Sequence, residues 1–268
     1  MSALIFRLRE APPERLDLSG LVPHRIGALS IAEIERLPIG TSRRGVAVAD
    51  IFAVEEGERT DIRFQGGSTR FDLVGAGLES GRLVVEGDVG QRLGQAMRGG
   101  TIEISGNAGP FAASAATAGL VRIAGHAGER AGGATHGAMH GLDGATLVIE
   151  GDAGDRLGER MRRGLLLVGG RAGDYAGSGL IAGTIVAQGV GDNPGYGMRR
   201  GTIIAATHGA LLPSFVPTGR HRLVVAQLLR RAVAAIRPQS AEIICEQTER
   251  LAGDLATLGK GEILMPVS

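Results

Sequence analysis

Apolar and polar residues alternate through the middle of the chain. Between residues 82 and 206, seven runs of five residues carry apolar side chains at their second and fourth positions. The runs are RLVVE, TIEIS, LVRIA, TLVIE, LLLVG, TIVAQ and TIIAA. A period of two places these side chains on one face of a strand. The pattern therefore predicts seven β-strands, each with one buried face.

Glycine clusters separate these runs with a spacing close to GxxGxxxG. The segment GDVGQRLG at residues 87–94 returns as GDAGDRLG at residues 151–158. Successive clusters begin 19 residues apart, except for one step of 26 residues, whose extra residues lie between Gly132 and Ala145. Glycine suits tight corners and close backbone approach. We expect structural turn glycines at Gly87, Gly90, Gly94, Gly106, Gly109, Gly125, Gly128, Gly132, Gly151, Gly154, Gly158, Gly170, Gly173 and Gly177.

A repeated strand with one apolar face cannot bury itself alone, but stacked copies share a core. The repeat predicts an all-β core, a right-handed parallel β-helix of about seven rungs with a mixed N-terminal cap and a C-terminal helical segment. We expect a single domain of residues 1–268. Its parts would be a cap at residues 1–61, the β-helix at 62–212, and a helix and tail at 213–268.

Three features of the flanks refine this expectation. Ser30 and Glu33 have the spacing of a capping box, which predicts a helix start. Residues 220–236 have the composition of a very apolar helix. Residues 241–264 fit a strand or a second helix followed by a tail, and periodicity leaves both open.

The third position of each run should point outward, yet it becomes apolar in the later runs. These positions are Val84, Glu103, Arg122, Val148, Leu167, Val186 and Ile204. A contiguous apolar stripe usually lies under other protein. The cover could be the helix expected at residues 220–236 or a neighbouring protein chain.

Composition narrows the function classes. The chain has 45 glycines and 3% aromatic residues. Its net charge is +1, so its electrostatic field is too weak to make nucleic acid or a membrane surface its main partner. No apolar run reaches the roughly 18 residues of a membrane span. We expect a cytoplasmic protein. The lone Cys245 can form neither an internal disulfide nor a cysteine cluster for a metal.

Motifs that could carry catalysis do not assemble. A dinucleotide fingerprint needs one glycine motif between a strand and a helix, whereas this motif recurs without helices. His136 and His140 are four residues apart, but Gly137 and Gly141 oppose a helix, so we expect no metal site. The acidic residues of GDVG and GDAGD suit turns in which they bond the local backbone. We expect no catalytic residue.

Arginine is the remaining candidate for a functional contact, because a Met-Arg pair recurs as MRGG, MRRG and MRRG. Stacked repeats would align these arginines on one edge. Such a column could bind carboxylates of a partner or a polyanionic ligand, or simply stay solvated. The candidates are Arg98, Arg162, Arg163, Arg199 and Arg200.

The segments GDVGQRLGQAMRGGTIEISG, GDAGDRLGERMRRG, LLPSF and GDLATLGKGEIL resemble the family of the C subunits of formylmethanofuran dehydrogenases. The resemblance covers nearly the whole chain. The tail and the arginine-rich composition are closer to the branch found in the formyltransferase/hydrolase complex of methylotrophic bacteria. The glycine repeat itself is shared with the C-terminal domain of glutamate synthase.

This resemblance implies a non-catalytic structural subunit of a four-subunit complex in one-carbon metabolism. Its partners would be an amidohydrolase-like, a formyltransferase and a third subunit. The complex would move the formyl group of formyl-tetrahydromethanopterin to methanofuran and release formate in formaldehyde oxidation. This subunit would bind no cofactor, although the arginine column could contact the polyglutamate tail of a methanofuran-type cofactor.

Two alternatives stay open at this point. The chain could be the C subunit of a tungsten or molybdenum formylmethanofuran dehydrogenase, whose metal centres would belong to partner subunits. It could also be a free-standing β-helix enzyme that acts on carbohydrate or acyl substrates, which would need clustered acidic, arginine or histidine side chains on one face.

Overall fold

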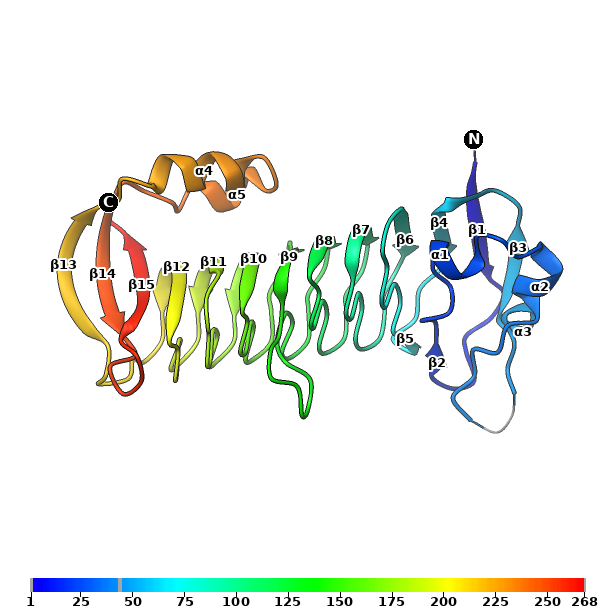
Figure 1. Cartoon of the computed structure of the whole chain (residues 1–268), viewed down its shortest axis with the longest axis horizontal. Coiled ribbons are helices and arrows are strands. Elements are labelled where there is room, and N and C mark those ends of the chain that lie inside the picture. The colour runs from blue at the N-terminus through cyan, green and yellow to red at the C-terminus, as the bar shows by residue number, and fades with distance from the viewer. Residues whose placement is uncertain (1, 43–44, 268) are drawn as a thin grey trace.

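A single long sheet of thirteen strands organises the chain. The structure, a computed structural model, describes residues 2–42 and 45–267. The strand order is β13-β14-β15-β12-β11-β10-β9-β8-β7-β6-β4-β1-β3, with a separate two-stranded sheet of β2 and β5. In Figure 1 the strands of the long sheet follow one another along the longest axis of the molecule.

All seven alternating runs are strands of this sheet, and neighbouring runs pair in parallel. They are β6 (Arg82–Glu86), β7 (Arg98–Ile104), β8 (Ala118–Ile123), β9 (Asp143–Ile149), β10 (Arg163–Ala172), β11 (Thr184–Val190) and β12 (Arg200–His208). Their second and fourth residues are buried, as the alternation predicts; Leu83 and Val85, for example, are 0% exposed. The core therefore lies along the inner face of the sheet.

The expectation of a right-handed parallel β-helix of about seven rungs is wrong. Between consecutive strands the chain returns through turns, which touch the next repeat by single isolated bridges such as Val89 to Ala108 and Ala108 to Ala127. Residues in these turns, such as Arg92 and Gly94, have positive φ, which extended strands do not allow. The strands thus form one sheet that is not closed, and flanking strands extend it to thirteen.

The N-terminal end of the sheet is built by the first 72 residues. Its elements are β1 (Ala3–Leu8), β2 (Leu16–Asp17), α1 (Pro23–Ile26), α2 (Ile31–Glu35), α3 (Val48–Ile51), β3 (Phe52–Glu55), β4 (Glu58–Gln65) and β5 (Phe71–Asp72). The capping box expected at Ser30 and Glu33 is confirmed, because the Glu33 amide donates to the Ser30 hydroxyl and the Ser30 amide donates to the Glu33 carboxylate. Helices α2 and α3 contact the edge strand β3 and cover this end of the sheet.

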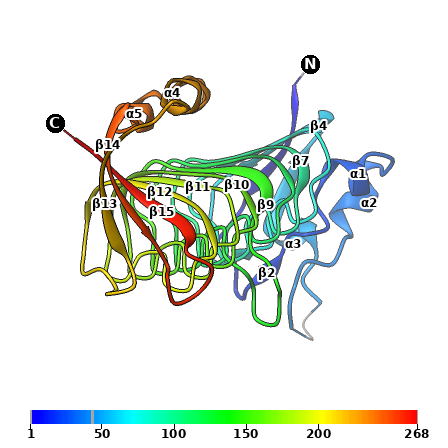
Figure 2. The same cartoon turned by 60° about the vertical axis from the view of Figure 1, so that its left-hand side comes forward.

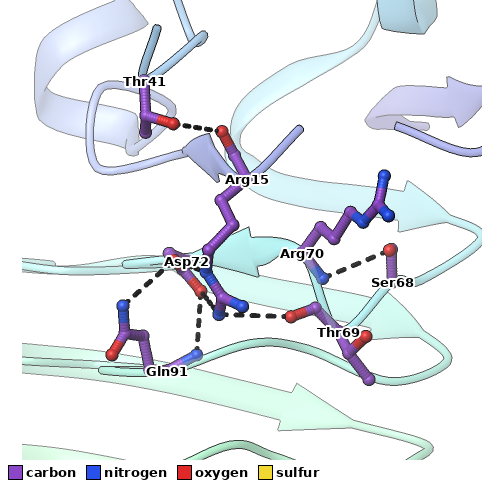
Figure 3. A network of polar contacts seen from close by, with 7 residues as sticks. All are labelled: Arg15, Thr41, Ser68, Thr69, Arg70, Asp72 and Gln91. Carbon is purple, nitrogen blue, oxygen red and sulfur yellow. Dashed lines mark hydrogen bonds and ion pairs between the residues drawn. The ribbon is translucent and has the colours of Figure 1, made fainter. Parts of the chain in front are cut away.

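Two kinds of contact join this end to the repeats. Phe6, Phe52, Phe64 and Phe71 form one ring cluster, with Phe6 and Phe64 stacked at 4.9 Å between centroids. Beside this cluster, the buried carboxylate of Asp72 accepts hydrogen bonds from the Arg15 guanidinium at 2.5 and 2.6 Å, and from the backbone and side chain of Gln91 (Figure 3). One carboxylate thus links the cap to the first repeat.

The C-terminal end adds three more strands and two helices. They are β13 (Val216–Arg222), α4 (Ala226–Ala234), α5 (Pro238–Ala241), β14 (Gln247–Gly253) and β15 (Lys260–Pro266). The helix expected over residues 220–236 is wrong in its first part, because β13 pairs with β14 there. The segment 241–264, which the sequence left open, is mainly the two strands β14 and β15.

Helices α4 and α5 cover the outer apolar stripe (Figures 1 and 2). Val148, Leu167, Val186 and Ile204 are at most 2% exposed and pack with Val233 and other residues of the helical segment. Of the two candidates for this surface, the chain's own helices are therefore the cover.

Charged groups fix these helices to the sheet. The Arg237 side chain, 10% exposed, donates to Glu150 at 2.8 Å and to Ser240 at 2.9 Å. Arg122 donates to Glu150 at 2.8 Å and to the backbone carbonyl of Ile236 at 2.9 Å. Glu150 therefore connects strand β8 to the segment that follows α4.

Asp254 secures the turn between β14 and β15. Its carboxylate accepts backbone hydrogen bonds from Gly197 and Ala256, both at 2.9 Å. Burial raises the pKa of Asp254, but hydrogen bonds from Ser214, Ala256 and Gly197 outweigh burial and hold the pKa below its usual value.

No helix in the described ranges is long and apolar enough to cross a membrane. The division of the chain at residues 61 and 212 into cap, repeats and tail stays a prediction.

Candidate functional site

The turns are held together by side chains that reach the next repeat. The Asp88 carboxylate accepts from the backbone amide of Asn107 at 2.7 Å, and Asn107 accepts from the amide of His126 at 2.8 Å. His126 Nδ1 then accepts from the amide of Asp152 at 2.9 Å, and Asp152 accepts from the amide of Arg171. The expectation that such acidic residues bond their local backbone is wrong, because each bond crosses to the following repeat.

Some turn glycines lie where a side chain has no room. Gly158 has φ +66°, and a Cβ there would lie 2.8 Å from Leu166 Cδ1 and 3.0 Å from Ile185 Cδ1. Gly109 has ordinary backbone angles, but a Cβ there would lie 2.7 Å from the backbone carbon of Gly90 in the preceding repeat. At Gly158 both the positive φ and the lack of space favour glycine, whereas at Gly109 the close approach of the preceding repeat alone does so.

The recurring Met-Arg pairs divide between core and surface. Met97, Met161 and Met198 are 0% exposed, whereas the arginines that follow them are exposed. Each methionine fixes its turn in the core, and each arginine therefore faces outward.

The five arginines of the expected column differ in their surroundings. Arg162 and Arg163 share the carboxylate of Asp143, with nitrogen to oxygen distances of 3.2 and 3.0 Å. Arg98 lies 3.7 Å from the Glu79 carboxylate and is 71% exposed. Arg199 and Arg200 are exposed, and within the described part of the chain neither forms an ion pair. Carboxylates thus neutralise the arginines of the earlier repeats, whereas Arg199 and Arg200 of the last repeat are available to bind another group.

A second set of side chains, missed from the sequence, lines the turns. The Arg130 guanidinium lies over the Phe111 ring at 5.7 Å, and that of Arg156 lies over the Tyr175 ring at 5.3 Å. Both arginines also bind Glu159, at 2.8 and 3.2 Å. A signal was present, because an arginine or aromatic residue stands two positions after the second glycine in the first five clusters.

The seven extra residues form a loop that projects beside β9 (Figure 1). One side of the loop bounds a hollow of about 200 Å³ lined by Arg130, His136, Glu159 and Arg160. The other side bounds a hollow of about 430 Å³. Its lining residues are Met139, His140, Arg160, Gly179, Ile181, Gly197 and Arg199.

The two histidines of this loop have different surroundings. The His136 ring packs against Phe111 at 5.4 Å, and its Nε2 lies 3.3 Å from an Arg130 nitrogen. His140 Nδ1 is buried without a hydrogen-bond partner. Across residues 2–42 and 45–267, no group of three or more histidine, cysteine or acidic side chains is placed to hold a metal ion.

Comparison with known proteins identifies relatives over nearly the full length. No family model matches the chain. The chain is 51% identical over 260 residues to the C subunit of the formyltransferase/hydrolase complex Fhc of Methylorubrum extorquens strain AM1, and the match covers 97% of this chain and 98% of that protein.

A solved structure gives the same result. The chain matches a chain of the X-ray crystal structure of the formyltransferase/hydrolase complex FhcABCD from Methylorubrum extorquens in complex with methylofuran, with a TM-score of 0.95 and 51% identity. The match covers 98% of this chain and 100% of that chain. With this identity over both chains, the protein belongs to the family of the C subunits of formyltransferase/hydrolase complexes.

Proposed function

We propose that this protein is a non-catalytic structural subunit of a formyltransferase/hydrolase complex. The observation that carries this proposal is the 51% identity to the Fhc relative over 97% of the chain, with the same fold at a TM-score of 0.95. The relative is one subunit of a multi-subunit assembly, so the partners proposed here are the other subunits of the corresponding complex.

In the proposed complex the chemistry belongs to the partners. A formyltransferase subunit passes the formyl group of formyl-tetrahydromethanopterin to the amine of methanofuran, and an amidohydrolase-like subunit hydrolyses the resulting formamide to formate. This chain contributes a rigid surface, and we place the complex in the cytoplasm.

The repeats and the C-terminal helices are consistent with a structural role. Continuous strand pairing from β3 to β13 makes one stiff body. The outer face of the sheet is already covered by α4 and α5, so that face is not left as an apolar surface for a partner to cover. Partner or ligand contacts are therefore expected on the arginine-bearing edge.

The arginine column is the proposed contact for a partner or for a polyglutamate tail of the methanofuran-type cofactor. Arg199 and Arg200 carry this proposal best, because internal carboxylates neutralise Arg98, Arg162 and Arg163. A carboxylate ligand gains most from arginines that are not already paired.

Affinity purification of the tagged protein from its native host at modest salt tests the structural role. Sizing, mass spectrometry of partners and metal analysis should find an amidohydrolase-like and a formyltransferase subunit without tungsten or molybdenum. Co-purification of iron–sulfur subunits with either metal would assign the chain to a dehydrogenase. A stable monomer without partners would contradict the structural role.

Coupled turnover of the complex tests the arginine contact. The double change Arg199→Gln and Arg200→Gln should slow formyl transfer between subunits, most at low salt, where charge interactions are least screened. The matched change Arg162→Gln and Arg163→Gln should have a smaller effect, because Asp143 already neutralises those two. Equal turnover in all three proteins would refute the contact.

A further inference from the structure

We propose that the 430 Å³ hollow beside the inserted loop binds a carboxylate carried on a short apolar stem, held by Arg160 and Arg199. This inference rests on the proposed function and deepens it, because it names one site on the arginine-bearing edge. A volume of this size lies within the roughly 300–1,000 Å³ of small-ligand sites.

The backbone at Arg160 is the first reason. Arg160 has φ +54°, a left-handed conformation that is strained for a residue other than glycine. The equivalent residues in the other repeats with this conformation are small: Gly77, Ala96, Ala115, Gly179 and Gly197. Glycine adopts this conformation without strain, whereas alanine and arginine both have a Cβ and are strained alike. The turn itself therefore does not require the long, charged side chain of Arg160.

The charges around the hollow are the second reason. Glu159 neutralises Arg130 and Arg156 on the far side of the loop, but among the described residues it forms no ion pair with Arg160. The hydrogen bond of Arg160 to the Ala138 carbonyl is long, at 3.5 Å. With Arg199 also lacking an ion pair in the described chain, two guanidinium groups line a hollow that has no acidic side chain in its lining. A carboxylate is the group that such arginines bind best.

The remaining lining residues define the rest of the ligand. His140 lines the hollow, and its Nδ1 is buried without a hydrogen-bond partner. Met139 is 74% exposed at the loop and lines the hollow together with Ile181. These two side chains suit a short chain of methylene groups next to the carboxylate.

Two sources can supply this chemistry: a free organic acid, or an acidic side chain of another subunit of the complex. Glutarate has both the carboxylate and the apolar stem, and glutaramide has the same shape without charge. The pair therefore separates charge recognition from shape.

The experiment uses the assembled complex with ¹³C-methyl methionine in this subunit. The change Met139→Leu assigns the Met139 methyl signal. Glutarate should shift that signal in a saturable way, whereas glutaramide should not. The double change Arg160→Gln and Arg199→Gln should weaken glutarate binding about tenfold or more, because it removes the charge-assisted hydrogen bonds of both guanidinium groups.

The control removes the same two charges outside the hollow. Arg171→Gln combined with Arg220→Gln should leave the glutarate affinity unchanged, because both side chains are exposed and neither lines the site. The Met139 signal also reports on the hollow in the full chain purified alone. A failure of the complex to co-purify is thereby distinguished from a failure of this site.

Each outcome decides the proposal. A glutarate shift that depends on Arg160 and Arg199 supports a site for free acids. If glutarate does not shift Met139 in the complex, but the double variant dissociates at lower salt than the control, the carboxylate comes from a partner subunit. If neither effect occurs, or if glutaramide binds as well as glutarate, the proposal is wrong.

Discussion

Replacing Glu150 should loosen α4 and α5 from the sheet while the sheet itself stays folded. Glu150 accepts hydrogen bonds from Arg122 on β8 and from Arg237 after α4, each at 2.8 Å. The change Glu150→Ala removes both bonds at once. Arg237, only 10% exposed, keeps the Ser240 hydroxyl as its one remaining partner in the network described.

The magnitude follows from the exposure of the partners. Removing one partner of a fully buried pair costs about 3–5 kcal/mol, whereas an exposed pair contributes about 0–1 kcal/mol. The side chains of Glu150 and Arg122 are both 34% exposed, so the case is intermediate. We expect a loss of about 2 kcal/mol, which is roughly a thirtyfold increase in the opening equilibrium of the helices.

Apolar contacts should keep the helices docked most of the time. Val233 and Ile244 are at most 2% exposed in the cluster under α4 and α5, and burying each contributes about 1.5–3 kcal/mol. These contacts remain in the variant, so the change should raise the frequency of local opening rather than detach the segment.

Hydrogen exchange followed by mass spectrometry measures this opening. Amides of α4 should exchange roughly thirty times faster in Glu150→Ala, while amides of β7 should be unchanged. The control is Glu103→Ala, whose ion pair with Arg82 is 2.8 Å long but 38% and 44% exposed. It should change exchange by less than about threefold, as expected for an exposed pair.

Two results would refute this reasoning. If α4 keeps its protection in Glu150→Ala, the ion pairs do not hold the helices. If protection falls equally in α4 and β7, the helices and the sheet unfold as one unit, and Glu150 stabilises the whole chain rather than one joint.

Three further changes test other contacts. Gly158→Ala should lower the free energy of unfolding, measured in urea, by about 2–3 kcal/mol, because the residue has positive φ and the added methyl group would clash with core side chains. In the control Gly137→Ala, φ is +79° but the space around the Cβ is open, so the loss should be only about 1 kcal/mol. His126→Ala should cost about 1 kcal/mol in the same assay, and His126→Asp should restore the lost acceptor and most of the stability. The lowered pKa of Asp254 contributes stability that is present above its unfolded pKa and is lost as pH falls through its folded pKa. Asp254→Asn should therefore be less stable at neutral pH, and acid titration should show the difference from the unchanged protein narrowing below about pH 4; a constant difference would exclude this linkage.

The sequence was sufficient to place the strands of the repeats. Alternation at positions such as Leu83 and Val85 marks a face that must be buried, and this depends only on local periodicity. It did not define the return path of each repeat, because the left-handed conformation of Arg92 and Arg130 does not follow from their residue type, as it does for glycine. Because the return path consists of turns rather than strands, the repeats form one open sheet and not the expected β-helix.

The ends of the sheet were harder to predict for a different reason. Strands β13 and β14 pair with each other across an intervening helical segment, so their pairing depends on tertiary contacts. The apolar run LVVAQLL next to β13 also fits helical periodicity, which extended the expected helix too far toward residue 220.

The candidate site was predicted only in part. The arginines of the Met-Arg repeat are exposed, and their role stays a prediction. The carboxylate of Asp143 lies 19 and 20 residues from the two arginines it neutralises, which one repeat of the sequence does not reveal. The hollow at Arg160 depends on the inserted loop meeting the turns of later repeats. No local pattern contains both sides of that contact.

The side-chain ladder through Asp88, Asn107, His126 and Asp152 gives the stack a direction. Each acceptor belongs to an earlier repeat and each donated amide to a later one. A chain leaving the ribosome therefore presents its acceptors before the amides they will bind, so every completed repeat is a template for the next. From β6 to β12 the order of synthesis matches the order in which neighbouring strands pair, whereas β12 gains its second neighbour, β15, only when residues 260–266 have been made.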